Sequence, residues 1–361
     1  MSSVDYTGTR SEHRVLIDVY PFKVQSGTWY NHADKRTPQL RQDSLADMTA
    51  ETSNTPQPLS DRLKLRGWIA ATRPRVFTAS YVPMGVAAAV ALQDGVFRLF
   101  PFVLALLGVV LLQTAANLIN EYFDYVRGAD TLKVAGQSMV IKNSLLTPRE
   151  VGIGAIVTTA AGSLIGLYFL TQTGPTLLWI GLGGVLVAIT YTAGPFPLAY
   201  NGLGELAAGI FMGPMIVLGA YYVMANTLYW ELVLISIPVA LMVAAILHAN
   251  NIRDLEADRS VNKRTLAVLL GRPAARVEYH LLVGGAYVSL VLLVVAGLIP
   301  PLALIALITL PEAIELMRII QRETDAAILH PAQGRTARLH GRFGMLMVVG
   351  WLVWLLLERL F

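Results

Sequence analysis

The chain of 361 residues contains no cysteine, which excludes disulfides, thiolate metal ligands and a cysteine nucleophile. Charged residues are also scarce, at 14%, whereas 55% of the residues are hydrophobic. Soluble domains are about 25% charged and about 45–50% apolar. Together with a mean hydropathy of +0.55, these proportions argue against a soluble globular domain, a disordered chain and a collagen-like chain. They favour an integral membrane protein.

Long apolar segments follow residue 75, each near the length of about 20 residues that a helix needs to cross a bilayer. Turn residues separate them, as at Thr173-Gly174-Pro175 and Pro300-Pro301. The predicted fold is therefore all-α, a polytopic membrane bundle of about nine transmembrane helices. The expected spans are 76–93, 99–120, 152–171, 176–194, 203–225, 230–249, 279–298, 301–320 and 343–360.

The N-terminal segment differs from the rest of the chain because it is polar and has no long apolar run. Charges at Asp5, Arg10 and Glu12 interrupt any signal-peptide hydrophobic region. We expect residues 1–66 to form a mostly disordered tail and residues 67–361 to form the transmembrane domain.

The distribution of basic residues predicts the orientation. Of the 28 Lys and Arg residues, only Arg98 and Arg359 fall on one side of the predicted spans, and the other 26 fall on the opposite side. Basic segments stay in the cytoplasm, so we expect a cytoplasmic N-terminus and an external C-terminus. The net charge of +4 is then explained by membrane topology or an anionic substrate, and no nucleic-acid partner is expected.

A first group of polar residues follows the second apolar segment. At about 100° per residue, Asn117, Glu121 and Asp124 fall on one face of a helix. We expect Gly128 to end this helix and to let Asp130 fold back. The candidate residues of this first acidic cluster are Asn117, Asn120, Glu121, Asp124 and Asp130.

A second group follows the sixth apolar segment. Asp254 and Asp258 are four residues apart and so share a helix face, with Asn250, Asn251 and Arg253 beside them. Like charges at this spacing destabilise a helix by roughly 0.2–0.5 kcal/mol, which a divalent cation would offset. Mg²⁺ prefers carboxylate oxygens together with substrate phosphates. Two such helix ends facing each other would bind a diphosphate through Mg²⁺.

Basic residues follow both clusters, namely Lys142 after the first and Lys263 and Arg264 after the second. Lys, Arg and Mg²⁺ neutralise a diphosphate while its C–O bond breaks, so these three residues are candidate catalytic groups. The alternative interpretation is that all these polar residues are helix ends in contact with water and charges that set orientation.

The two clusters resemble the motifs of a known family. Residues 117–130 are similar to the first aspartate-rich motif of the UbiA superfamily of intramembrane aromatic prenyltransferases, and Asp254 with Asp258 is similar to the second. The resemblance covers about residues 70–361. Segments 191–205, 250–258 and 263–271 are similar to the 1,4-dihydroxy-2-naphthoate polyprenyltransferase branch of menaquinone synthesis. In that branch, Asp usually stands at the position of Glu121.

The resemblance implies Mg²⁺-dependent transfer of an isoprenyl chain from a prenyl diphosphate to an aromatic acceptor, with loss of CO₂ if the acceptor is dihydroxynaphthoate. Glu121, Asp124, Asp130, Asp254 and Asp258 would hold the metal, and Asn117, Asn120, Asn250, Asn251 and Arg253 the substrate. Tyr191, Tyr200 and Phe196 would line the allylic cation site. The enzyme would be a multi-pass protein of the cell membrane, with lipid around its bundle and its active site facing the cytoplasm.

Other functions remain open from the sequence. Within the superfamily, the acceptor could be homogentisate, 4-hydroxybenzoate, haem or a chlorophyll precursor. A membrane transporter could also use acids and amides in a central site. A CDP-alcohol phosphotransferase would show the pattern Asp-Gly, Ala-Arg, Gly, Asp and Asp in that order along the chain, which we do not find in this sequence.

Overall fold

The computed structural model describes residues 60–130, 133, 136 and 138–360. Their regular structure is helical, apart from one isolated bridge between Asn201 and Arg264. The predicted all-α class is therefore confirmed. The predicted tail at 1–66 lies mostly outside the described residues, but residues 61–66 form the first half of a helix, α2.

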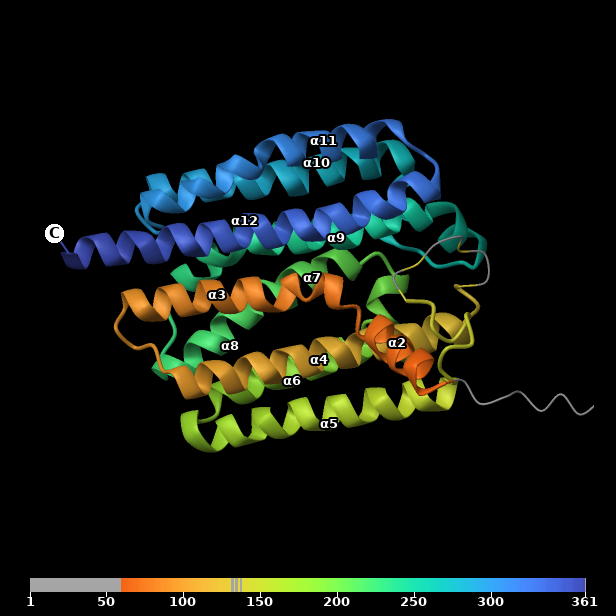
Figure 1. Ribbon diagram of the computed structural model, residues 1–361, viewed down its shortest axis with the longest axis horizontal. Coiled ribbons are helices and arrows are strands. Elements are labelled where there is room, and N and C mark those ends of the chain that lie inside the picture. Colours follow the sequence, from red (N-terminus) through yellow and green to blue (C-terminus); the bar gives the residue numbers. More distant parts are fainter. Residues whose placement is uncertain (1–59, 131–132, 134–135, 137, 361) are drawn as a thin grey trace, which may run out of the picture. The chain divides into compact units, whose positions relative to one another are not determined.

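Figure 1 shows the helices running mostly side by side. In chain order they are α2 (Asp61–Thr72), η1 (Pro74–Val76), α3 (Thr78–Gln93), α4 (Leu99–Val126), α5 (Pro148–Thr173), α6 (Thr176–Thr190), η2 (Leu198–Tyr200), α7 (Gly204–Met212), α8 (Pro214–Ala225), α9 (Glu231–Ser260), α10 (Leu266–Val295), η3 (Pro301–Thr309), α11 (Leu310–Arg322) and α12 (Ala326–Leu360).

Six spans in the described part of the chain are long and apolar enough to cross a membrane, or seven if the pair 61–76 and 78–93, bent by 49°, counts as one. The nine expected spans are thus not all recovered by length. Segment 176–194 ends early, as the 15-residue α6, and segment 301–320 divides into the 3₁₀-helix η3 and α11. Segment 203–225 is recovered as the span Gly204–Ala225, within which α7 and α8 meet at Gly213.

Local signals fix the helix ends near the polar clusters. Gly128 takes a φ of 72° directly after α4, as a helix C-terminus requires, and the chain turns back there. At the start of α5, Thr147 and Glu150 form a reciprocal capping box, and Pro148 occupies the first turn. Thr265 caps α10 by accepting a hydrogen bond from the Val268 amide.

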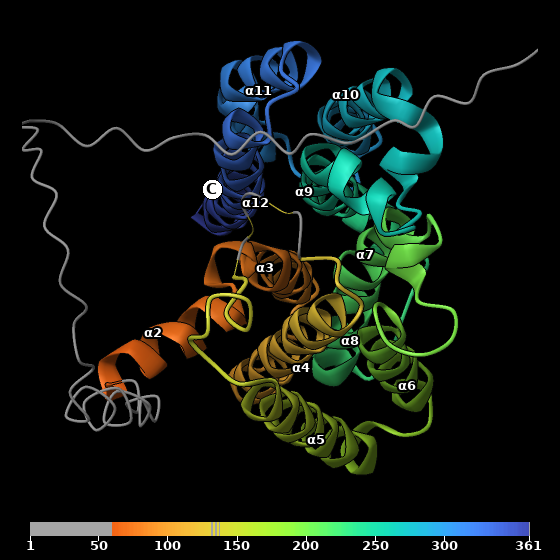
Figure 2. The same ribbon diagram turned by 90° about the vertical axis from the view of Figure 1, so that its right-hand side faces the viewer.

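Helix α9 is the central element of the bundle. In Figure 2 it lies between α10, α12 and α7, and 67% of its apolar stretch is buried, more than in any other span described. Large apolar side chains on the outer helices are exposed instead, including Ile156, Leu164 and Trp179. Such extensive exposed apolar surface is stable only in contact with lipid. The chain is a multi-pass membrane protein.

The loops that carry most basic residues meet at one end of the bundle. In Figure 1, α2 and the connections α4–α5, α9–α10 and α11–α12 lie at the right-hand end, whereas the C-terminus lies at the left. Both acidic clusters therefore lie at the same end. We call this the loop end.

Candidate active site

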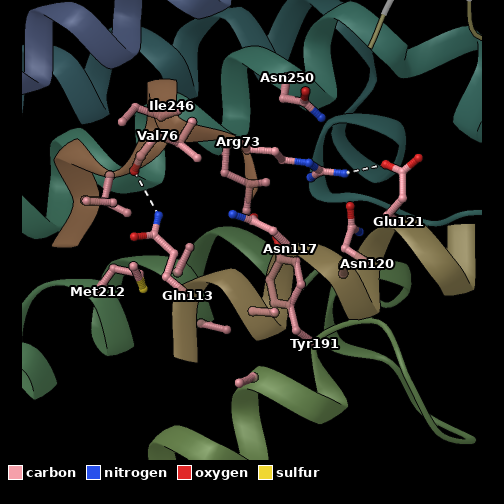
Figure 3. A pocket seen from close by; sticks show the side chains of 18 of the residues that line it. Arg73, Val76, Gln113, Asn117, Asn120, Glu121, Tyr191, Met212, Ile246 and Asn250 are labelled. Atoms are coloured by element: carbon pink, nitrogen blue, oxygen red, sulfur yellow. Dashed lines mark hydrogen bonds and ion pairs between the residues drawn. The ribbon is translucent and has the colours of Figure 1, made fainter. Parts of the chain in front are cut away.

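A cavity of about 290 Å³ opens between α3, α4, α6, α7 and α9 near the loop end. Its wall changes character along α4. Val109 and Leu112 line the apolar part, Gln113 and Asn117 follow, and Asp124 lies at the polar mouth. These positions recur at three- and four-residue spacing, so a single helix face supplies the whole gradient. Figure 3 shows the polar side chains that converge on the cavity.

Four residues of the first acidic cluster lie on one face of α4, as predicted, and Asp130 follows the end of the helix. Asn117, Asn120, Glu121, Asp124 and Asp130 all line the cavity. The amide of Asn117 donates to the Thr72 carbonyl at 2.9 Å, which attaches the end of α2 to α4.

Glu121 is held by the protein on both of its carboxylate oxygens. Oε2 accepts hydrogen bonds from Arg73 Nη2 at 3.4 Å and from the Ser138 hydroxyl, and Oε1 accepts from the Ile141 amide at 3.3 Å. Arg73 ends α2 with a φ of 54°, which turns its side chain toward the cavity (Figure 3). Glu121 thus joins α4, α2 and segment 138–141.

The second acidic cluster lies on the last turns of α9. Arg253 donates from Nε and Nη2 to the two carboxylate oxygens of Asp254, at 2.7 and 2.6 Å, and from Nη2 to Asn250 Oδ1 at 2.8 Å. This two-pronged pair fixes Asp254 at the cavity wall, where Asn250, Asn251 and Arg253 also lie.

Two lysines form ion pairs with the clusters: Lys263 connects the first to the second, and Lys133 lies within the first. Lys263 Nζ lies 3.3 Å from Asp124 Oδ2 and 3.7 Å from Asp258 Oδ1, so it joins α4 to α9. Lys133 Nζ lies 3.3 Å from Asp124 and 3.0 Å from Asp130. Burial lowers the pKa of Lys263, but the charges of the surrounding aspartates outweigh burial and hold the pKa above its ordinary value. The ammonium is therefore charged at neutral pH.

Two tyrosines follow α6. The Tyr200 hydroxyl donates to Asp124 Oδ1 at 2.7 Å, and its ring lies under Lys263 Nζ at 5.0 Å, but it is not part of the cavity wall. Tyr191 does line the cavity. Burial and then the negative charge of Glu205 raise its pKa, so the phenol is neutral and can donate a hydrogen bond. Phe196 is 59% exposed and does not line the cavity.

Three further candidates lie outside the cavity wall. Asp258 is buried behind Lys263. Arg264 is exposed, and its backbone amide bonds to the Tyr200 carbonyl at 3.2 Å. Lys142 is exposed, and its ammonium donates to the carbonyls of Asp130 and Lys133.

Several cavity residues were missed by sequence reasoning. Arg73 and Lys133 were counted only among the 26 basic residues that predict the orientation. Gln113, Ser138 and Gln333 were not candidates. Gln113 accepts a hydrogen bond from Ser80 and donates to the Val76 carbonyl at 2.8 Å. The Nε2 atom of Gln333 is buried without a hydrogen-bond partner among the described residues. The one signal for Gln113 in the sequence is that it is a polar residue within the apolar segment 99–120.

The donor set fits a magnesium ion that a diphosphate helps to bind. No three His, Asp or Glu side chains in the described part of the chain lie close enough to enclose an ion alone. Mg²⁺ does not need such an enclosure, because it is commonly bound by one or two carboxylates, phosphates and water. Both carboxylate oxygens of Asp258 are buried without a hydrogen-bond donor in the same part of the chain. Lys263 Nζ, 3.7 Å from Oδ1, is its cationic partner, and the two oxygens keep acceptor capacity for a further cation.

The fold and the paired acidic helix ends define an intramembrane transferase. The UbiA prenyltransferase family matches residues 81–330. The chain belongs to this family and is a prenyltransferase.

Relatives and solved structures agree with this assignment. The chain is 32% identical to the 1,4-dihydroxy-2-naphthoate octaprenyltransferase of Bacillus subtilis (78% of this chain and 91% of the relative), and 31% identical to the one of Escherichia coli (80% and 95%). It is also 33% identical to the UbiA prenyltransferase domain-containing protein 1 homolog of Drosophila melanogaster (85% of each).

Among solved structures, a UbiA homolog from Aeropyrum pernix shares the fold with a TM-score of 0.59 at 18% identity, over 75% of this chain and 97% of that one. A UbiA homolog from Archaeoglobus fulgidus bound to DMAPP and Mg²⁺ does so with a TM-score of 0.54 at 16% identity, over 78% and 99%.

Proposed function

We propose that the protein transfers an isoprenyl chain from a prenyl diphosphate to 1,4-dihydroxy-2-naphthoate, in a Mg²⁺-dependent step of menaquinone synthesis. The observation that carries the proposal is the gradient along one face of α4, from an apolar wall to a mouth where two acidic clusters meet. A prenyl diphosphate has the same polarity, since an apolar chain ends in a polyanion. The names of the Bacillus and Escherichia relatives support the choice of acceptor.

Asp124, Asp130 and Asp254 would hold Mg²⁺ at the mouth of the cavity. Asp258 lies outside the cavity wall and is paired with Lys263. Bound there, Mg²⁺ supplies positive charge to the diphosphate as it leaves. Lys133, Lys263 and Arg73 add fixed positive charge at the same place, and their bonds to carboxylates hold them ready before substrate binds. Lys142 and Arg264 are not given this role, because they lie outside the cavity wall.

The apolar part of the cavity would hold the first isoprene units and keep water from the allylic cation. The face of the Tyr191 ring stabilises positive charge at that point. The C–O bond to the diphosphate breaks, and the ring carbon that bears the carboxylate forms a bond to the allylic carbon. The bond from this ring carbon to the carboxylate carbon then breaks, CO₂ leaves, and its electron pair restores the aromatic ring.

We further propose nine membrane crossings with the loop end in the cytoplasm, in a cell membrane. η3 rises about 2.0 Å per residue and α11 about 1.5 Å, so together they are long enough for a bilayer core of about 30 Å. The shorter α6 packs against α4 and α5. The gathering of the basic loops at one end supports the orientation.

The choice of acceptor needs a direct test. The Drosophila relative is as similar to this chain as the bacterial relatives are, and its name specifies no acceptor. Purified protein in proteoliposomes should be given radiolabelled prenyl diphosphates of several lengths with Mg²⁺. The acceptors should be 1,4-dihydroxy-2-naphthoate, 4-hydroxybenzoate and homogentisate. Prenylated, decarboxylated product from dihydroxynaphthoate alone supports the proposal, whereas a preference for another acceptor would replace it.

A further inference from the structure

A buried polar cluster lies directly behind the cavity wall. It comprises Glu205 in the first turn of α7, His248 and Asn251 on α9, and Glu278 on α10. Glu205, His248 and Asn251 are no more than 5% exposed. Only Asn251 also lines the cavity. Burying such groups is costly unless they are paired, and among the described residues Glu205 Oε2 and Glu278 Oε2 have no hydrogen-bond partner, although Glu278 Oε2 lies 3.5 Å from His248 Nε2.

The hydrogen bonds define the arrangement of the cluster. Glu205 Oε1 lies 2.9 Å from His248 Nδ1 and accepts from Asn251 Nδ2 at 2.8 Å. His248 Nε2 lies 2.8 Å from the Ala275 carbonyl, which can only accept. A doubly protonated imidazole satisfies both the carbonyl and the carboxylate. His248 and Asn251 thus contact the same oxygen of Glu205, and His248 helps to fix its position.

The same contacts determine which end of the Asn251 amide faces the cavity. A carboxylate oxygen only accepts hydrogen bonds, so the NH₂ end must face Glu205. The carbonyl oxygen Oδ1 is then the end left for the cavity. A carbonyl oxygen recognises a hydrogen-bond donor. An ionised diphosphate has no such donor and an isoprenyl chain has none, whereas a hydroxylated aromatic ring does.

We propose that Asn251 Oδ1 accepts a hydrogen bond from a hydroxyl of the aromatic acceptor, and that Glu205 and His248 are positioning residues that hold Asn251 in this orientation. The inference rests on the proposed function, since it concerns the second substrate of that reaction. Helix α9 would then contact both substrates: Asp254 and Asp258 lie on the diphosphate side, and Asn251 binds the acceptor.

The test compares Michaelis constants for the two substrates. Asn251→Leu keeps the side-chain size and removes Oδ1, and Glu205→Gln and His248→Gln remove the charges that orient it. Each variant should raise the KM for the acceptor about tenfold, the effect of one lost hydrogen bond, and leave the KM for prenyl diphosphate and the Mg²⁺ requirement unchanged. His280→Gln is the matched control, because His280 bonds to the Met317 carbonyl outside the cavity wall.

Inhibitor binding gives a second measurement, which does not require Glu205→Gln or His248→Gln to be active. Competitive inhibition is measured with 2-naphthoate and with its 1-hydroxy and 4-hydroxy derivatives. In the unmodified protein, one hydroxyl should improve binding about tenfold, and in Asn251→Leu this advantage should vanish. This comparison holds even if Glu205→Gln fails to fold.

The outcomes separate the two proposals. An unmodified protein that prenylates none of the hydroxylated acceptors contradicts the proposed function and this inference together. Normal prenyl transfer with an unchanged acceptor KM in Asn251→Leu overturns the inference alone. A raised Mg²⁺ requirement in Asn251→Leu also overturns it, because Oδ1 would then act on the metal side.

Discussion

Individual charged side chains at the loop end are bound to partners of opposite sign. Asp124 forms ion pairs with Lys133 and Lys263 and also accepts a hydrogen bond from Tyr200. It is buried, and so are both lysines. Removing one partner from such a group leaves an uncompensated charge, which makes the group sensitive to substitution.

Asp124→Asn should lower prenyl transfer by about 100-fold or more, since electrostatic groups at a developing charge contribute on this scale. Initial rates at saturating Mg²⁺ measure the effect. Asp94→Asn is the matched control, because Asp94 also accepts hydrogen bonds from two tyrosines, Tyr221 and Tyr229, but does not line the cavity. Equal losses in both variants would argue that Asp124 supports folding only.

Glu121 differs from Asp124 because its partners are parts of the protein scaffold. Glu121→Gln retains an acceptor oxygen but loses the charge that faces Arg73. We expect a lower rate with little change in the Mg²⁺ concentration that gives half-maximal activity. Rate against Mg²⁺ concentration measures this, and a large shift would identify Glu121 as a direct metal ligand.

At the scale of helices, α12 packs closely against its neighbours through glycine. A Cβ atom at Gly350 would lie 2.2 Å from the Leu302 carbonyl oxygen, which belongs to the backbone of η3 and cannot rotate away. Gly350→Ala should therefore destabilise the protein by about 1–3 kcal/mol. Gly334→Ala, on the same helix but with nothing within 4 Å of the added Cβ, should be neutral or stabilising. Thermal unfolding in detergent compares the two, and equal melting temperatures would contradict the packing.

Helix α12 also reaches the cavity through Gln333, just beyond the family match at residue 330. Its buried Nε2, which has no hydrogen-bond partner in the described part of the chain, is a donor suited to a diphosphate oxygen. Gln333→Leu should raise the KM for prenyl diphosphate about tenfold and leave the acceptor KM unchanged. A changed acceptor KM alone would assign Gln333 to the other substrate.

What the sequence predicted at this scale was local. Helical periodicity places Asn117, Glu121 and Asp124 on one face, and Gly128 ends α4 as expected. Contacts between distant segments could not be read in the same way. Lys142 and Lys133 are both basic residues in one loop, but of the two only Lys133 lines the cavity. Arg73 and Gln333 enter from α2 and α12, and no sequence spacing relates them to α4.

For the whole molecule, the absence of cysteine allows single-cysteine labelling of topology. Ser144 and Ser260 are exposed at the loop end, and Thr227 is exposed at the other end between α8 and α9. In intact cells, an impermeant maleimide should label Thr227→Cys but not Ser144→Cys or Ser260→Cys. The reverse pattern would place the loop end outside the cell.

The central claim is that the two acidic helix ends bind a prenyl diphosphate through Mg²⁺ for transfer to dihydroxynaphthoate. The most direct measurement is release of ¹⁴CO₂ from carboxyl-labelled 1,4-dihydroxy-2-naphthoate by the purified protein with a prenyl diphosphate, as Mg²⁺ is removed with EDTA and restored. We expect release that requires prenyl diphosphate, stops in EDTA and returns with added Mg²⁺. Prenyl transfer that continues undiminished in EDTA would contradict it.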